Sequence, residues 1–440
     1  MTKNLLDKYF FILFSIIPIS LVIGPAVSLV NIVLIDLSFI VLFFYRKEKF
    51  LFSNSAVKLL FIMYIYLIFN SLMSIDPSLG IIRNLGFIRF VILFLAFNYF
   101  FNRNKYFNKI FFIWVLTIIL LCFDILIEVY YGTNLLGYGG EYGRRIVSFF
   151  KDEPIIGGYL NGFFLILIGF IYLNYKKYNN RYKYFLLLFS LFILIIILLT
   201  GERSNAIKAF LGILIFFVLN KEFTKKEKFF ALLSSIIILS ILYSNSNYLK
   251  LRWKGQIIDN GTNLFLNNEH FKKNILKGNT FETTQEKITF VKKINLYYSE
   301  NIYFNIYRSG LEVFKNNPVF GVGNKNYRVE TCDAKFHKEN PKYYCTTHPH
   351  QIYFEILAEH GIIGFLIIFS ILFFLTFQIL KTVPASKNYL QLGCLSYVLV
   401  VFIPILPSGA FFGDFFATIF WINFSIMYAC NNETNIFFKK

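Results

Sequence analysis

The sequence predicts an all-α polytopic membrane protein with about twelve transmembrane helices and one large, partly helical periplasmic loop between spans 9 and 10. Hydrophobic residues make up 56% of the chain, aromatic residues make up 20%, and the mean hydropathy is +0.57. Such values lie outside the range of soluble globular proteins. The formal net charge is +19, but the cations lie between apolar runs and form no basic stripe on a soluble domain. We therefore predict no nucleic-acid partner.

Each predicted span is an apolar run of roughly twenty residues, the length that crosses a bilayer as a helix. The predicted spans are 9–26, 27–45, 57–75, 82–101, 110–131, 154–175, 184–200, 204–220, 229–246, 361–380, 389–407 and 410–430. The shorter runs cross a membrane only as members of a bundle. The chain thus divides into residues 1–246 with spans 1 to 9, a polar loop at 247–360, and residues 361–440 with spans 10 to 12.

Lysine and arginine residues indicate which connections face the cytoplasm, because cytoplasmic loops carry an excess of cations. Alternate connections hold the cations: Lys3 and Lys8; Arg46, Lys47, Lys49 and Lys58; Arg103, Lys105 and Lys109; Lys176, Lys177, Arg181 and Lys183; Lys221, Lys225, Lys226 and Lys228; Lys381 and Lys387; Lys439 and Lys440. Both termini are therefore predicted in the cytoplasm, and 247–360 outside the cytoplasmic membrane. The first helix lacks a small-residue cleavage site and is predicted to be a retained signal-anchor.

Two histidines close the polar loop in the stretch Thr346-Thr347-His348-Pro349-His350-Gln351. Pro349 suits the first turn of a helix, where its missing N–H is not needed, and the preceding threonines suit a cap. This places His350 at a helix N-terminus, where the helix dipole favours the neutral imidazole that can accept a proton. Gln351, Glu355 and Glu359 follow at four-residue spacing and form one polar stripe. The pattern suits a catalytic base.

Three arginines lie in segments predicted to face outward. Arg145 begins a polar patch at the mouth of the sixth span, Arg203 lies in a tight turn between two apolar helices, and Arg308 lies on an amphipathic helix. Guanidinium groups at such places suit bidentate binding of phosphate. The alternative is a salt bridge of Arg203 with Glu202, or of Arg308 with Glu312. Spacing alone leaves both interpretations open.

Charged residues within or beside the predicted spans are costly and are default functional candidates. They are Asp36, Arg83, Arg89, Asp124, Glu128, Lys208 and Asp414. We interpret most of them as structural, because polar groups pair inside bundles and side chains at helix ends reach the interface.

The two cysteines outside the spans, Cys332 and Cys345, lie on the oxidising side of the membrane, where disulfides persist. A disulfide between them would staple the loop just before His348. The alternative is a zinc site formed by Cys345, His348, His350 and His360. The sequence contains no C-x-x-C or H-E-x-x-H pattern, so we predict the disulfide and no metal.

Several of these segments together resemble the O-antigen ligase and O-antigen polymerase superfamily of bacterial envelope glycosyltransferases. The hallmark of that family is a histidine followed by Asn, Ser or Gln, nine residues and a glycine, which here is His350, Gln351, 352–360 and Gly361. The turn around Arg203 and the segment from Arg308 to the Gly321-Val322-Gly323 turn are also similar. The stretch from Arg145 resembles a subgroup that tends to have a cysteine shortly before the histidines.

The resemblance implies a transferase that acts at the periplasmic face on a glycan carried by undecaprenyl pyrophosphate. His350 would be the general base, and Arg203 and Arg308 would bind the pyrophosphate of the donor. Arg145, His348, Gln351 and Glu355 would support them. The acceptor would be a lipid A core in a ligase or a second lipid-linked glycan in a polymerase. No cofactor is implied, because the leaving group is already activated.

The sequence leaves other functions open. Its motifs do not separate a ligase from a polymerase, and they do not identify the sugar, the acceptor, the oligomeric state or partner proteins. A transporter of lipid-linked glycans also fits twelve spans, but transporters concentrate their sites near the bilayer midplane and not at the end of a long outer loop. A membrane scaffold would need neither the outer arginines nor His350.

Overall fold

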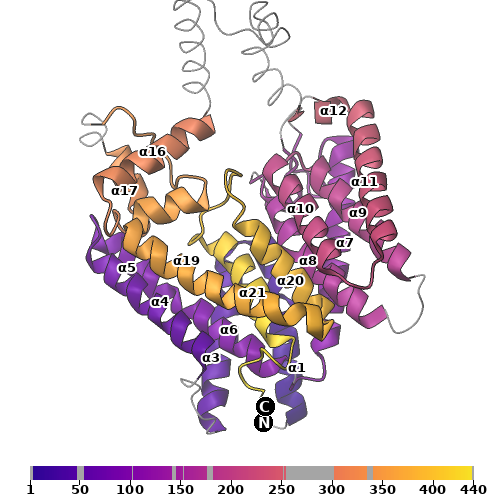
Figure 1. Cartoon of the computed structure of the whole chain (residues 1–440), viewed down its shortest axis with the longest axis horizontal. Coiled ribbons are helices and arrows are strands. Elements are labelled where there is room, and N and C mark those ends of the chain that lie inside the picture. The colour runs from indigo at the N-terminus through magenta and orange to yellow at the C-terminus, as the bar shows by residue number, and fades with distance from the viewer. Residues whose placement is uncertain are drawn as a thin grey trace, which may run out of the picture.

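The computed structural model describes residues 3–46, 54–101, 103–140, 145–151, 153–175, 182–250, 252–253, 302–333 and 340–438. Nearly half of the predicted outer loop, at 254–301 and 334–339, lies outside these residues. Helices are the regular elements throughout the described part, which contains no strand. The two termini lie side by side at one end of the molecule, and α16 and α17 lie at the opposite end (Figure 1).

The helices follow the predicted order. Their bounds are α1 Lys3–Ser15, α2 Ile17–Ile23, α3 Pro25–Tyr45, α4 Ser55–Leu72, α5 Pro77–Gly86, α6 Ile88–Phe100, α7 Phe107–Tyr131, η1 Ser148–Phe150, α8 Ile156–Tyr175, α9 Tyr182–Leu199, α10 Arg203–Leu219, α11 Lys225–Asn245, α12 Asn247–Lys250, α16 Ile302–Asn316, α17 Tyr327–Cys332, α19 Ile352–Ser386, α20 Tyr389–Val401 and α21 Asp414–Ala429. All twelve predicted spans overlap helices of this series.

Seven helices of the described part are long and apolar enough to cross a membrane, or eight if the bent pair α1 and α2 is one span. Three further apolar helices, in α9, α20 and α21, are shorter. The chain is therefore a multi-pass, all-helical membrane protein. The number twelve stays a prediction, because the shorter helices do not reach the length of a span by themselves.

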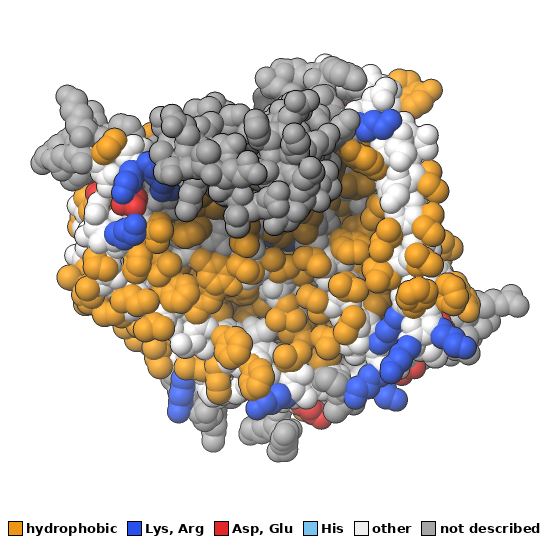
Figure 2. Space-filling model, turned by 45° about the horizontal axis from the view of Figure 1, so that its top comes forward, with side chains coloured by type: hydrophobic (Ala, Val, Ile, Leu, Met, Phe, Trp, Pro, Cys, Tyr) orange, Lys and Arg blue, Asp and Glu red, His pale blue; other side chains and the backbone are white. Residues whose placement is uncertain are grey.

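The interior is built around α20, which packs against α8, α10, α19 and α21. The α8–α20 contact is close because glycines face it: a Cβ on Gly393 would lie 2.0 Å from the carbonyl oxygen of Leu165, and a Cβ on Gly169 would lie 2.3 Å from that of Tyr389. Small residues let helix backbones approach closely where lipid provides no hydrophobic driving force between helices. One face of the molecule carries a broad hydrophobic region, with lysine and arginine along its lower edge and also at its upper left and upper right (Figure 2).

The helix that follows the histidines, α19, is broken at Gly361. Gly361 has φ 63° and ψ −167°, a conformation almost restricted to glycine. The turn 318–323 enters at the break: the carbonyls of Pro318 and Val319 accept hydrogen bonds from Ile362 and Ile363 at 2.8 and 3.2 Å. On the other side, the N–H groups of residues 322 and 323 donate to the carbonyls of residues 358 and 359, both at 2.9 Å. The outer segment is thereby fastened to α19.

Candidate functional site

The two histidines lie in the turn before α19 and not inside its first turn. The N-cap is Gln351, whose side-chain oxygen accepts from the backbone N–H groups of Tyr353 and Phe354 at 2.7 and 3.2 Å. The predicted threonine cap and the placement of Pro349 within the helix are therefore wrong. His350 has φ 51°, a left-handed conformation that reverses the chain and sets its ring 4.0 Å from that of His348 between centroids. Glutamine offers the acceptor that the backbone needs at this reversal.

The predicted polar stripe on α19 is buried and holds neighbouring segments in place. Gln351, Glu355 and Glu359 are each at most 2% exposed. Both carboxylate oxygens of Glu355 accept from the N–H of Phe411, at 3.0 and 2.9 Å, and Glu359 accepts from the N–H of Tyr327 at 3.4 Å. The two buried carboxylates therefore hold the segments around Phe411 and Tyr327 against α19, because a buried carboxylate that accepts from a backbone N–H fixes the position of that backbone.

The segment between α20 and α21 contacts the histidine turn directly. The N–H of Ser408 donates to the carbonyl of His350 at 2.8 Å. Two side chains also donate to carbonyls of this segment. The Tyr307 hydroxyl donates to the carbonyl of Ile405 at 3.1 Å, and the Lys208 ammonium donates to that of Pro407 at 2.9 Å. Lys208 therefore has the structural role predicted for most of the membrane charges.

Three arginines lie near one another, and one of them, Arg145, is close to His350. Arg145 is close enough to His350 and to Arg203 to affect the pKa of both groups. Arg203, the first residue of α10, donates to the carbonyl of Arg252 at 3.2 Å, and Arg252 donates to that of Gly201 at 3.1 Å. We call Arg145, Arg203 and Arg252 the arginine cluster. Three neighbouring guanidinium groups favour an anion among them, since each offers paired donors to phosphate oxygens.

Aromatic residues of α16 lie against the same histidine. The ring of Tyr303 stands edge to face with that of His350, with centroids 6.3 Å apart, and Tyr307 packs on Phe354 at 5.4 Å. Tyr303 is also close enough to Arg203 and Arg252 to influence the pKa of both guanidinium groups. His350, Tyr303 and the arginine cluster therefore form one group.

The chain brings Arg145 to this place through two acids of α7. Glu128 accepts from the N–H groups of Val147 and Ser148 at 3.0 and 2.6 Å, and Asp124 accepts from the Ser148 hydroxyl at 2.6 Å. The N–H of Ile146 then bonds to the carbonyl of residue 200, in the turn that precedes Arg203, at 3.1 Å. Both acids serve as structural acceptors, in agreement with the sequence interpretation.

Burial favours the neutral form of both histidines. Burial, and then the positive charge of Arg145, lower the pKa of His350 below its usual value. Burial, followed by the neighbouring His350, lowers the pKa of His348 to about 3. Neutral imidazole is the form that accepts a proton. The two rings differ in the arginine that acts on them. The charge of Arg145 lowers the pKa of His350, and the charge of Arg83, in α5, lowers that of His348.

Neither of the two salt bridges considered from the sequence forms in the described part of the chain. Glu202 instead accepts from the N–H groups of Gly157 and Gly158 at 2.6 and 3.2 Å. Burial, the largest influence, raises the pKa of Glu202 to about 7. Glu312 pairs with lysines 315 and 342, at 2.9 and 3.4 Å. Arg308 is exposed on α16 and forms no ion pair within the described residues.

Arg308 is also separate from the arginine cluster. Its charge is not one of those that shift the pKa of His350, Arg203 or Arg252. It follows Tyr307 directly on α16, so its side chain points about 100° away from the tyrosine face of that helix. The structure brings together Arg145, Arg203 and His350, but it does not bring Arg308 to them.

A disulfide joins Cys332, the last residue of α17, to Cys345 in the segment that leads to the histidines. Cys345 is therefore not a free thiol, which removes one of the four ligands considered for zinc. Within the described residues, no group of three or more His, Cys, Asp or Glu residues is arranged to hold a metal ion.

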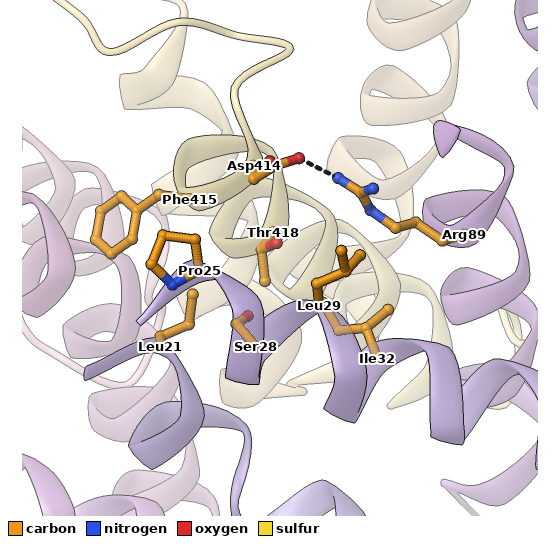
Figure 3. A pocket seen from close by; sticks show the side chains of 9 residues that line it. All are labelled: Leu21, Pro25, Ser28, Leu29, Ile32, Arg89, Asp414, Phe415 and Thr418. Carbon is orange, nitrogen blue, oxygen red and sulfur yellow. Dashed lines mark hydrogen bonds and ion pairs between the residues drawn. The ribbon is translucent and has the colours of Figure 1, made fainter. Parts of the chain in front are cut away.

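A second charged feature lies away from the histidines. Arg89 pairs with Asp414 beside a small cavity between α3 and α21 (Figure 3). The volume of this cavity is about 10 Å³, roughly that of one water molecule. We therefore interpret the pair as a contact between α6 and α21 and not as a binding site.

Sequence reasoning missed two members of the site, Arg252 and Tyr303. Arg252 follows the ninth predicted span by six residues and lies next to Trp253, which is a signal for an interfacial position. Tyr303 begins an i, i+4 aromatic pair with Tyr307. Neither pattern alone distinguishes a site residue from one of many aromatic and basic residues in this chain.

Comparison with known proteins adds the family. Fold and composition define the class, a multi-pass membrane protein, and the site within it combines neutral histidines with clustered arginines. Residues 187–369 match the family model described as O-Antigen ligase, which supports membership of the O-antigen ligase family and agrees with the resemblance drawn from the sequence. The matched region includes Arg203, Arg252, Arg308 and His350, whereas Arg145 lies outside it. No curated protein matches the chain.

Proposed function

We propose that this protein is an inverting glycosyltransferase of the O-antigen ligase type, which transfers a glycan from undecaprenyl pyrophosphate to an acceptor, a lipid A core, at the periplasmic face of the inner membrane. The observation that carries the proposal is the position of His350 beside the arginine cluster and Tyr303 in a membrane protein that matches the O-antigen ligase family. The long segment 247–360 is the periplasmic loop that bears most of this site.

In the proposed reaction, neutral His350 accepts the proton of an acceptor hydroxyl. The hydroxyl oxygen attacks the anomeric carbon of the donor sugar, and the bond from that carbon to the pyrophosphate oxygen breaks with inversion. The pyrophosphate leaves with the bonding electron pair. Arg203 and the neighbouring Arg145 and Arg252 stabilise its developing charge. A role for Arg308 stays a prediction from the sequence, because this side chain lies on the exposed face of α16 and apart from the cluster.

The proposed reaction needs no metal, because the cationic side chains supply the charge stabilisation that a metal would supply. Lipid A core as the acceptor gives a ligase, and a second lipid-linked glycan gives a polymerase. The lipopolysaccharide of a deletion strain separates these two: a ligase predicts loss of all long chains, and a polymerase predicts a core with a single repeat.

The catalytic assignment predicts different effects for the two neighbouring histidines. His350→Ala should reduce transfer by a factor on the order of 100 to 10,000, the usual contribution of a general base, whereas His348→Ala should cost less. Transfer from a polyprenyl-pyrophosphate glycan by purified protein, with and without chelator, measures both. Equal losses in the two variants together with sensitivity to chelator would mean that the pair binds a metal.

A further inference from the structure

A large cavity lies between α9, α10 and α11, and we call it the α10–α11 cavity. Its volume is about 430 Å³, within the range of small-molecule sites, about 300 to 1,000 Å³. Leu194 of α9 and Ala206, Ile207 and Phe210 of α10 line it, and no charged side chain does so in the described part of the chain. An occupant would therefore be apolar along its length.

The opposite wall is one face of α11. Residues Ile236, Leu239, Ser240, Tyr243 and Ser244 line the cavity, at the i, i+3, i+4, i+7 and i+8 positions of a helix. All 21 residues of α11 are described, and none is buried. Unlike α8 and α20, α11 is therefore not closely packed against the other helices. The space between α10 and α11 can accommodate an extended lipid chain.

One end of the α10–α11 cavity adjoins the arginine cluster. Arg203 is the first residue of α10, and the lining residues Ala206 and Ile207 follow within one turn. Trp253 lines the cavity, and its chain neighbour Arg252 belongs to the cluster. The apolar lining of the cavity is thus directly adjacent to the arginine cluster.

Two buried donors lie at this junction. The Nε of Arg252 and the Nε1 of Trp253 are buried, and neither has a hydrogen-bond partner within the described structure. Buried donors are normally paired, because leaving one unpaired costs free energy. An anionic group that entered this junction would supply acceptors for unpaired donors, and a ligand that joins an anionic head to an apolar chain would fill both regions.

We propose that the α10–α11 cavity receives the isoprenoid chain of the donor, with its pyrophosphate at the arginine cluster. This inference rests on the proposed function and adds to it the path of the lipid. Membrane phospholipid is the alternative occupant. The cluster favours the donor, because three guanidinium groups match the greater charge of a pyrophosphate better than that of a single phosphodiester. The branched aliphatic and aromatic lining suits a methyl-branched chain.

Adjacent residues of α11 provide a matched pair of variants. Ile236 lines the cavity and Ile237 does not, and their exposed fractions are similar, at 47% and 49%. Ile236→Trp should raise the KM for a long-chain polyprenyl donor by about tenfold, which corresponds to about 1.4 kcal/mol, and should leave the KM for a geranyl donor unchanged. Ile237→Trp should leave both KM values unchanged. An unchanged KM for the long-chain donor in Ile236→Trp, or an equal rise for both donors, would overturn the inference.

A binding measurement separates this inference from the proposed function. Wild-type protein in nanodiscs is labelled with a photoreactive isoprenoid pyrophosphate, and the labelled peptides are identified by mass spectrometry. Labelling should fall on α9, α10 or α11 and decrease about tenfold in Ile236→Trp. Such labelling of a protein without transferase activity would uphold the lipid site and reject the enzymatic proposal. Labelling elsewhere, or its loss when phosphatidylglycerol is added in excess, would overturn the lipid site.

Discussion

His350 experiences opposing electrostatic influences from the protein and from the proposed substrate. Burial and the charge of Arg145 both lower its pKa in the protein alone. A pyrophosphate bound among the arginines would act in the other direction, since a nearby negative charge favours imidazolium. The arginine cluster offsets that negative charge. The residues proposed to bind the leaving group would thus also help to keep the proposed base neutral.

This arrangement predicts the pH dependence of an Arg145 variant. A base acts only when neutral, so a lowered pKa extends activity to pH values below the ordinary imidazole pKa of about 6.5. Arg145→Gln removes a positive charge that lowers the pKa of His350, so that pKa rises. The acid limb of the profile of kcat/KM, which reports the free enzyme, should move to higher pH.

Arg83 provides the control for this experiment. Its charge acts on His348 and is not among the influences that shift the pKa of His350. Arg83→Gln should leave the acid limb where it lies in the wild type. An unmoved limb in Arg145→Gln would contradict the assignment of His350 as the titrating base, whatever the change in maximal rate.

Sequence patterns identify residues of this site where the chemistry is local and miss those that depend on the fold. His350 and Arg203 were found from their positions beside helix starts. Arg252 was missed because its place in the site depends on a contact between segments that are distant in the sequence. The Arg203 guanidinium donates to the carbonyl of Arg252 at 3.2 Å. The helix cap was assigned wrongly because threonine and glutamine both offer side-chain oxygens, and only the left-handed backbone of His350 decides between them.

At the scale of the elements, the break in α19 explains the spacing between the histidine and Gly361. A continuous helix would leave no free donors at Ile362 and Ile363 for the 318–323 turn. A glycine at this position allows the break and the close approach together. A Cβ there would lie 2.3 Å from the carbonyl oxygen of Val319.

We predict that Gly361→Ala destabilises the protein. The conformation of Gly361 alone should cost about 1 to 3 kcal/mol for a residue with a Cβ, and the contact with Val319 adds to this cost. The variant should unfold at lower temperature in detergent and lose transfer activity, because the turn that anchors the outer segment is displaced.

The matched control is Gly86→Ala at the end of α5. The nearest atom to its added Cβ is the end of the flexible Arg89 side chain, at 3.3 Å. The expected change in stability is within about 0.5 kcal/mol. If Gly361→Ala and Gly86→Ala unfolded at the same temperature, the break would not require glycine, and the explanation of the spacing would fail.

For the whole molecule, the positions of the helices could be predicted closely from hydrophobicity. Apolar runs of about twenty residues need a helix in lipid, because the backbone has no water to bond to. The number of crossings could not be obtained in the same way. Helices such as α20, from Tyr389 to Val401, are held by α8, α10 and α21, and packing of this kind permits a short helix that hydrophobicity alone does not distinguish from a full span.

The arrangement of the termini supports a prediction of topology. The N- and C-terminal ends lie together at one end of the molecule, opposite α16 and α17 (Figure 1), and lysine and arginine occur along the lower edge in Figure 2. An even number of crossings brings both termini to the same side. Cation-rich short connections then assign that side to the cytoplasm.

We therefore predict twelve crossings, with the segment 247–360 in the periplasm. Reporter fusions after Asn54, Asn179 and Lys387 should report cytoplasm, and a fusion at Asn279 should report periplasm; Asn179 and Asn279 lie outside the described residues. The fusion after Asn179 is the most decisive, because it follows α8 and precedes the helices that carry Arg203 and the α10–α11 cavity. A periplasmic signal there would reverse α9 and α10 and place Arg203 in the cytoplasm, where a donor presented at the periplasmic face could not reach it. The topology and the proposed site would then be rejected together.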